Sequence, residues 1–255
     1  MLHEYDALKE YVRCVMKRKL VSILALGILV GGAVCLPGYR SITTSIHQAA
    51  DTAVVVVDPG HGGIDGGAES SSGVIEKDVN LSISLLLKEK LEEQEIQVVM
   101  TRDTDRGLYD EGEEGAIRTL KTQDMKTRKK IIDEAGARLA VSVHLNSFTE
   151  DTSVKGAQVF FPSYGEKTLV ADSKAAAKII QAALNDGINT EKARTELGKS
   201  DVFLLRNITC PIVIVECGFL SNPEDAENLV TEAYQEKLAA ILNTSICKYL
   251  SETDQ

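Results

Sequence analysis

Residues Val54–Gly63 have the sequence VVVVDPGHGG, in which four valines, typical of a buried strand, lead into a glycine-rich turn that contains His61. Two later apolar segments end in a similar way, one immediately before His144 and the other immediately before Glu216. In an open α/β sheet, ligands bind beyond the carboxyl ends of the strands. If the three strands are parallel neighbours, two imidazoles and a carboxylate converge on one cleft. Such a set suits a hydrolytic zinc site, which needs three protein ligands, an open position and a nearby base.

Strand-like and helix-like segments alternate along residues 53–250. We predict strands at Val54–Val57, Ile96–Met100, Leu139–Val143, Gln158–Phe161, Val202–Leu205 and Ile212–Val215. We predict helices at Val79–Glu93, at Met125–Ala135 with Asp124 as its cap, at Ser173–Leu184, from Asn222 onward and at Tyr234–Tyr249, with a polar insert at Thr101–Lys121. This alternation predicts a single three-layer α/β domain, in which helices cover both faces of a twisted, mainly parallel sheet of about six strands.

An apolar segment near the N-terminus predicts a membrane anchor or a signal segment. A basic triplet at 17–19 precedes seventeen uncharged, mostly apolar residues, Leu20–Leu36, and a spanning helix needs about 17–25. This charge pattern places residues 1–19 in the cytoplasm. An uncleaved anchor is favoured, because the sequence GAVC at 32–35 is a poor cleavage site. Residues 37–52 would then be a tether to an extracytoplasmic domain at 53–250.

Charge divides the chain at the same place. Six basic and three acidic residues give residues 1–50 a net charge of +3. The net charge of the whole chain is −10, so residues 51–255 carry −13. An acidic domain without a basic cluster does not suit nucleic acid or anionic lipid as a partner. Among the five cysteines, Cys210, Cys217 and Cys247 lie in this domain. We expect them to be buried free thiols, with a single disulfide among them as the alternative.

Each candidate side chain also has an ordinary structural explanation. Taken alone, His61 would more often be a hydrogen-bonded turn residue, and Glu76, just before the first predicted helix, is favoured there by the helix dipole. His144 is harder to dismiss, because it ends a strand beside small polar residues. Glu216 follows four β-branched residues, where a buried carboxylate needs a partner such as a metal. All four side chains are expected at one edge of the sheet. A single metal site there accounts for all of them, and we favour it over a separate structural explanation for each.

Five motifs carry a resemblance to a known family: DPGHGG at 58–63, EKD at 76–78, TR at 101–102, SVHLN at 142–146 and ECGFLSN at 216–222. Their order across residues 53–250 resembles the zinc-dependent N-acetylmuramoyl-L-alanine amidases of the amidase-3 type. The resemblance implies that His61, Glu76 and His144 bind Zn²⁺ and that Glu216 is catalytic. It also implies hydrolysis of the amide between muramic acid and the L-alanine of the peptidoglycan stem. Cys217 replaces a more usual small aliphatic residue, and on a strand it should point away from Glu216.

The resemblance also suggests how the site works. The metal would polarise the amide carbonyl and lower the pKa of a bound water toward about 7, while Glu216 would pass the proton of that water to the departing amine. Sites of this kind need outer groups that orient the ligands. We expect Asp58 or a loop carbonyl to orient an imidazole, and Asn146 and Arg128 are further candidates for outer contacts or for contacts with substrate.

Within the family, the likeness is to the germination-specific spore-cortex amidases. It rests on the insert DEG at 110–112 with Gly115 and Arg118, on the short anchor, and on FLLRN at 203–207. This branch implies action between the two forespore membranes, where removal of the stem precedes formation of muramic-δ-lactam. The resemblance is also compatible with a protein activator or a lipoprotein partner.

Two other functions stay open on the sequence alone. The first is a vegetative autolysin with the same chemistry, although such enzymes usually carry wall-binding modules that this sequence lacks. The second is an inactive, membrane-anchored peptidoglycan-binding scaffold, against which the intact set of His61, Glu76, His144 and Glu216 argues.

Overall fold

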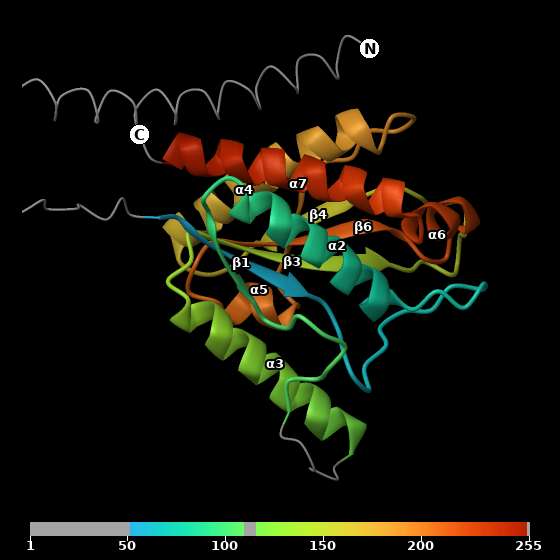
Figure 1. The fold of residues 1–255 in the computed structure, drawn as a ribbon, viewed down its shortest axis with the longest axis horizontal. Coiled ribbons are helices and arrows are strands. Elements are labelled where there is room, and N and C mark those ends of the chain that lie inside the picture. The colour runs from blue at the N-terminus through green and yellow to red at the C-terminus, as the bar shows by residue number, and fades with distance from the viewer. Residues whose placement is uncertain (1–51, 110–115, 254–255) are drawn as a thin grey trace, which may run out of the picture. The chain divides into compact units, whose positions relative to one another are not determined.

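The computed structural model describes residues 52–109 and 116–253, which form a three-layer α/β domain (Figure 1). Its six strands are arranged in the order β2-β1-β3-β6-β4-β5. The strands are β1 (Val54–Pro59), β2 (Gln97–Met100), β3 (Leu139–Asn146), β4 (Gln158–Pro162), β5 (Leu197–Lys199) and β6 (Ile212–Phe219). The helices described are α2 (Glu76–Glu92), α3 (Ile117–Glu134), α4 (Lys167–Gly187), α5 (Phe203–Asn207), α6 (Pro223–Leu229) and α7 (Glu232–Thr253).

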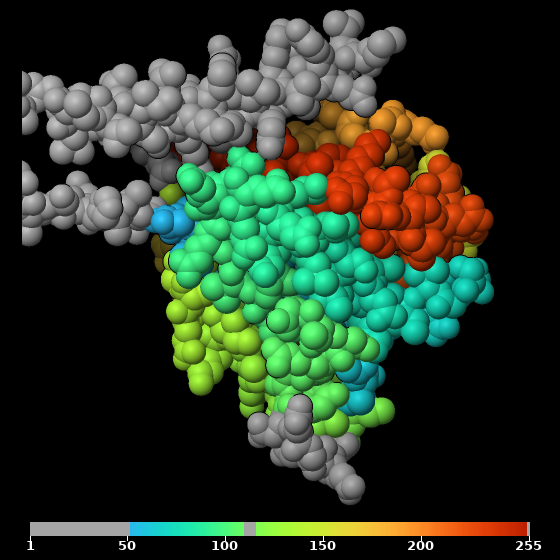
Figure 2. Space-filling model, in the orientation of Figure 1, coloured from blue at the N-terminus to red at the C-terminus, as the bar shows by residue number. Residues whose placement is uncertain are grey.

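The alternation of side chains along the strands builds two hydrophobic cores, one on each face of the sheet. On one face, side chains such as Val57 and Val215 pack with α2, α4, α6 and α7. On the other face, side chains such as Val56 and Ile214 pack with α3 and α5. Helices α2 and α7 lie side by side on the outside of the first face (Figures 1 and 2). The predicted three-layer domain is therefore confirmed.

The three strands that carry the candidate residues are parallel neighbours. Strand β3 pairs in parallel with β1 on one side and with β6 on the other, and the register places His144 opposite Glu216. Their carboxyl ends therefore meet at one edge of the sheet, as the sequence predicts. The sheet is mixed at its far side, because β4 pairs antiparallel with β6. None of Cys210, Cys217 and Cys247 forms a disulfide, although only Cys217 is fully buried.

The predicted strand at Val202–Leu205 is wrong. Residues Phe203–Asn207 form α5, and the last strand of the sheet is the short β5. Adjacent Leu204 and Leu205 are both buried in the core beneath α5, and a short apolar run of this kind does not distinguish helix from strand. The sequence pattern of β5, in contrast, is too short and too polar to identify a strand.

Helix α3 begins earlier than predicted, at Ile117 instead of Met125, so the polar insert is shorter than Thr101–Lys121. Most of the added residues are polar, and Ile117 and Leu120 alone do not make the apolar stripe that predicts a helix, so the sequence pattern indicates a loop there. Asp124 is consequently not a cap: it lies inside the helix and accepts a hydrogen bond from Arg128 Nε at 2.6 Å. The predicted cap at Asn222 is confirmed, because its side chain accepts a hydrogen bond from the backbone of Asp225.

No helix within residues 52–109 and 116–253 is long and apolar enough to cross a membrane. The predicted cytoplasmic segment and anchor, and the tether except for Thr52, lie outside the described residues. The DEG insert at 110–112 and Gly115 lie outside them as well.

Candidate active site

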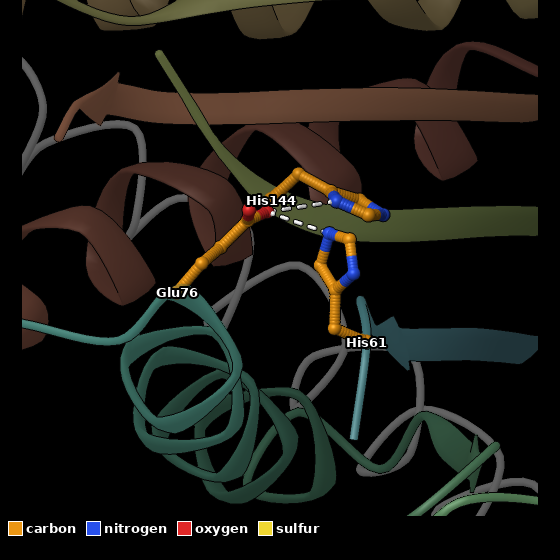
Figure 3. Close-up of side chains that lie close together, drawn as sticks. All are labelled: His61, Glu76 and His144. Carbon is orange, nitrogen blue, oxygen red and sulfur yellow. Dashed lines mark hydrogen bonds and ion pairs between the residues drawn. The ribbon is translucent and has the colours of Figure 1, made fainter. Parts of the chain in front are cut away.

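His61, Glu76 and His144 come together from three different elements (Figure 3). His61 lies in the loop after β1, Glu76 is the first residue of α2, and His144 lies on β3. One oxygen of Glu76, Oε1, lies 3.1 Å from His61 Nε2 and 3.0 Å from His144 Nδ1. The planes of the two imidazole rings meet at 78°, with the ring centroids 5.0 Å apart. The three side chains each offer one metal-ligand atom, and these atoms lie within 4.8 Å of one another.

The carboxylate of Glu76 is fixed by backbone donors as well as by the two imidazoles. The N–H of Ala68 donates to Oε2 at 2.8 Å, and the N–H of Leu145 donates to Oε1 at 3.0 Å. Burial alone would raise the pKa of Glu76, but the hydrogen bonds with His144 and His61 hold that pKa well below its usual range. The side chain is therefore ionised and held in one orientation, as a metal ligand would need to be. The dipole of the helix N-terminus alone would not require these contacts.

His61 is held by a second carboxylate that the sequence analysis missed. Asp65 Oδ2 lies 3.0 Å from His61 Nδ1, on the side of the ring away from Glu76. Burial alone would lower the pKa of His61, but the hydrogen bonds to Asp65 and Glu76 raise it to about 9. A carboxylate on the outer nitrogen of an imidazole is the usual orienting partner of a metal-binding histidine. The position of Asp65 four residues after His61 was the signal available in the sequence.

Two buried arginines bind the turn that carries His61. Arg102 Nε donates to the carbonyls of Pro59 and His61, at 3.1 and 2.7 Å, and Arg102 Nη2 donates to that of Gly60 at 2.9 Å. Arg128 Nη1 donates to Pro59 O at 2.7 Å, and Arg128 Nη2 donates to His61 O. The turn needs this support because His61 has a φ of 62°, in the left-handed region.

The other candidates for outer contacts lie in different places. Asp58 is buried and accepts hydrogen bonds from Arg128, Thr101 and Ser142, at 2.5, 2.6 and 2.6 Å. These partners replace the predicted contact with an imidazole, so Asp58 reaches His61 only through Arg128. The guanidinium of Arg128 donates to the carboxylates of Asp58 and Asp124 and to two backbone carbonyls. The side chain of Asn146 accepts from its neighbour Ser147 and does not enter the cluster.

Glu216 lies beside the cluster, on the strand next to His144. It lines a cavity of about 190 Å³ together with His61 and His144. Its Oε2 atom is buried and has no hydrogen-bond partner among the described residues. Burial raises the pKa of Glu216 and so does Glu76, while His144 opposes the shift. Cys217 points to the opposite face of the sheet, into the core, as the strand alternation predicts.

The donor set fits a zinc ion. Two imidazole nitrogens and one carboxylate oxygen are the ligand types of hydrolytic zinc sites, in which the fourth position stays open. Each imidazole directs one nitrogen at the carboxylate, where a metal would take the place of a proton. Within the described part of the chain, no other group of histidine, cysteine, aspartate or glutamate side chains has such a geometry.

Comparison with known proteins shows the family of this chain. Residues 55–248 match the model of the N-acetylmuramoyl-L-alanine amidase family of the amidase-3 type. The chain belongs to this family. It is therefore an N-acetylmuramoyl-L-alanine amidase, a hydrolase that acts on peptidoglycan.

Individual relatives support the assignment. The chain is 37% identical to the germination-specific N-acetylmuramoyl-L-alanine amidase of Bacillus subtilis over 201 residues, which are 78% of this chain and 80% of that protein. It is 29% identical to the amidase AmiA of Escherichia coli, over 77% of this chain and 75% of that one. Among solved structures, this amidase resembles the CwlD amidase from Clostridioides difficile in complex with the GerS lipoprotein, with a TM-score of 0.74 and 38% identity, over 79% of this chain and all of that chain.

Proposed function

We propose that this amidase is zinc-dependent and that it removes peptide stems from muramic acid in the spore cortex, as a step toward muramic-δ-lactam. The observation that carries the zinc dependence is the meeting of His61, Glu76 and His144 beside Glu216. The specialised role is supported by the likeness to a relative whose name is germination-specific amidase.

The residues divide into ligands and a base. His61, Glu76 and His144 would hold the zinc, which supplies a Lewis acid for the scissile carbonyl and for the attacking water. Glu216 would accept the proton of that water and deliver it to the nitrogen of L-alanine as the amide breaks. Its burial and its raised pKa suit this task, because both favour a carboxyl group that holds a proton between the two transfers. Its unpartnered Oε2 is free for this use.

The predicted place of action is the membrane surface where cortex is assembled. We infer that residues 20–36 anchor the enzyme and that its catalytic domain acts outside the cytoplasm, in the space between the forespore membranes. The related CwlD amidase is described in complex with a lipoprotein. By that likeness, we infer that a lipoprotein partner assists this amidase at the same membrane.

Digestion of defined muropeptides tests the chemistry. We expect the purified full-length chain to release intact stem peptides and leave unsubstituted muramic acid, as measured by mass spectrometry. A chelator should abolish the release, and added Zn²⁺ should restore it. Full activity in the presence of a chelator that removes all bound metal would contradict zinc dependence.

The composition of spore cortex tests the physiological role. Spores of a strain without this gene should contain cortex with intact stems and no muramic-δ-lactam. Normal lactam content together with a defect in the separation of vegetative cells would instead assign the enzyme to the autolysin function.

A further inference from the structure

Lys199 provides a positive charge in the active-site cavity that the mechanism above does not use. Four basic side chains line this cavity: His61, Arg128, His144 and Lys199. The two histidines contact Glu76, and Arg128 is paired with Asp58 and Asp124. In contrast, no hydrogen bond or ion pair joins the ammonium group of Lys199 to a carboxylate or carbonyl within the described residues, although its charge acts to lower the pKa of Glu216.

The Lys199 side chain is held by an aromatic ring instead of an anion. Its Nζ lies over Phe160, 4.4 Å from the ring centroid, and both side chains line the cavity. Such a contact stabilises the ammonium group while leaving its N–H donors available. A lysine in this position is therefore oriented toward the cavity and is ready to bind an anion.

The sheet fixes where that anion would lie. Glu216 is on β6, Phe160 on the neighbouring β4, and Lys199 on β5 beyond it. Two strand spacings correspond to about 10 Å across the sheet. Along the strands, Glu216 lies opposite Gln158 whereas Lys199 lies opposite Pro162, four residues further along β4. Only the side chain of Lys199, extended over Phe160, therefore approaches Glu216. Ile214 on β6 and Phe160 on the neighbouring β4 line the cavity and form an apolar floor, and the other apolar lining residues are Met125, Val202 and Leu204. The base thus stands at one end of a short apolar floor and the lysine at the other.

The substrate carries an acidic group beyond the scissile amide. The residue after L-alanine in a peptidoglycan stem is commonly a γ-linked glutamate, whose α-carboxyl group is either free or amidated. An extended peptide advances at most about 3.3–3.6 Å per residue, so this group lies about 7 Å from the scissile amide. The Lys199 side chain extends over Phe160, on the strand next to that of Glu216, and so brings its ammonium group toward the same part of the cavity.

We propose that Lys199 binds the free α-carboxylate of the second stem residue and makes the enzyme prefer unamidated stems. This proposal rests on the proposed function, because it places the scissile amide between the metal ligands and Glu216. The stem would cross the apolar floor from β6 toward β5, and the glycan would lie on the opposite side of the metal site.

The test compares two muropeptides that differ at a single group, the α-carboxylate or α-carboxamide of the second stem residue. We expect the wild-type chain to cleave the carboxylate form with a kcat/KM about 10- to 100-fold higher, the range that a hydrogen bond to a charged group contributes. Lys199→Met should remove most of this preference by slowing cleavage of the carboxylate form, and Lys199→Arg should retain it.

A matched control is available on the other face of the sheet. Lys174 lies over Phe161, 5.7 Å from the ring centroid, and does not line the cavity. Lys174→Met should therefore leave both rates and the preference unchanged. Equal rates of the wild-type chain on both muropeptides, or an equal loss on both in Lys199→Met, would overturn the role of Lys199 while leaving the amidase assignment intact. Failure of the wild-type chain to cleave either muropeptide would count against the proposed function as well as this inference.

Discussion

Gly60 lies directly against the imidazole of His144. A Cβ atom added at Gly60 would come within 2.3 Å of Cε1 and 2.4 Å of Nε2 of that ring, and no real contact is so short. The glycine is therefore needed because a metal-ligand candidate occupies the space of its missing side chain, and the turn brings the backbone of β1 close to the ring from β3.

This contact predicts that Gly60→Ala displaces His144. We expect zinc affinity and amidase activity to fall by at least about 100-fold, together with about 1–3 kcal/mol of stability from overpacking. Gly187→Ala is the control, because its new methyl group would meet only the flexible end of Ile241, far from the site. Zinc affinity can be measured by competition with a chelator. Equal zinc affinities of Gly60→Ala and Gly187→Ala would refute the predicted displacement of His144.

Arg102 differs from an ordinary buried arginine in its partners, which are all carbonyl oxygens. Its guanidinium donates to residues of the His61 turn and also to Thr104 and Lys77, at 3.1 and 2.9 Å. An ammonium group cannot reproduce this planar fork. We expect Arg102→Lys to lower the free energy of unfolding by about 2–4 kcal/mol, because buried carbonyls lose their donors.

The effect of Arg102→Lys should extend to metal binding, because His61 would lose the support for its left-handed backbone. Urea unfolding and zinc titration measure the two effects separately. The exposed Arg206, changed to lysine, is the control. Unchanged zinc affinity in Arg102→Lys would show that the arginine stabilises the turn without positioning the ligand.

The buried pair of Asp58 and Arg128 predicts a specific dependence of stability on pH. Burial alone would raise the pKa of Asp58, but Arg128, Ser142 and Thr101 lower it below the ordinary value. A carboxyl group with a depressed pKa stabilises the fold above its unfolded pKa of about 3.9, and that stabilisation is lost as the pH falls through the folded pKa.

We therefore expect the free energy of unfolding to decline below about pH 4 less steeply in Asp58→Asn than in the wild-type chain. At pH 7 the variant should be less stable by about 3–5 kcal/mol, because Arg128 loses a buried partner. Urea unfolding in the presence of a chelator separates these effects from metal release. Parallel acid limbs in the two proteins would contradict this role of Asp58.

Some of the site could be predicted from the sequence, for reasons that are local. Each strand that carries a candidate residue is an apolar run ending in a side chain that needs a partner, so His61, His144 and Glu216 were identified before their contacts were known. The register of β3 with β6 then places His144 opposite Glu216. The role of Glu76 came from the family resemblance, because its place at a helix start has an ordinary explanation.

The rest depends on long-range contacts that no local pattern encodes. Asp58 and Arg128 are 70 residues apart, so the sequence could not show their contact. For that reason Asp58 was predicted, with a loop carbonyl as the alternative, to contact an imidazole. The edge strand β5 and helix α5 were confused because their identity is decided by what they pack on. Lys199 belongs to that same segment, so the sequence alone did not place it in the cavity.

The separation of metal ligand from base is the most direct test of this account. Elemental analysis and turnover should be measured together for the wild-type chain, His144→Ala and Glu216→Gln. We predict one zinc per wild-type chain, loss of both zinc and turnover in His144→Ala, and full zinc with turnover reduced by about 10²- to 10⁴-fold in Glu216→Gln. Full zinc occupancy and a wild-type rate in His144→Ala would contradict the account.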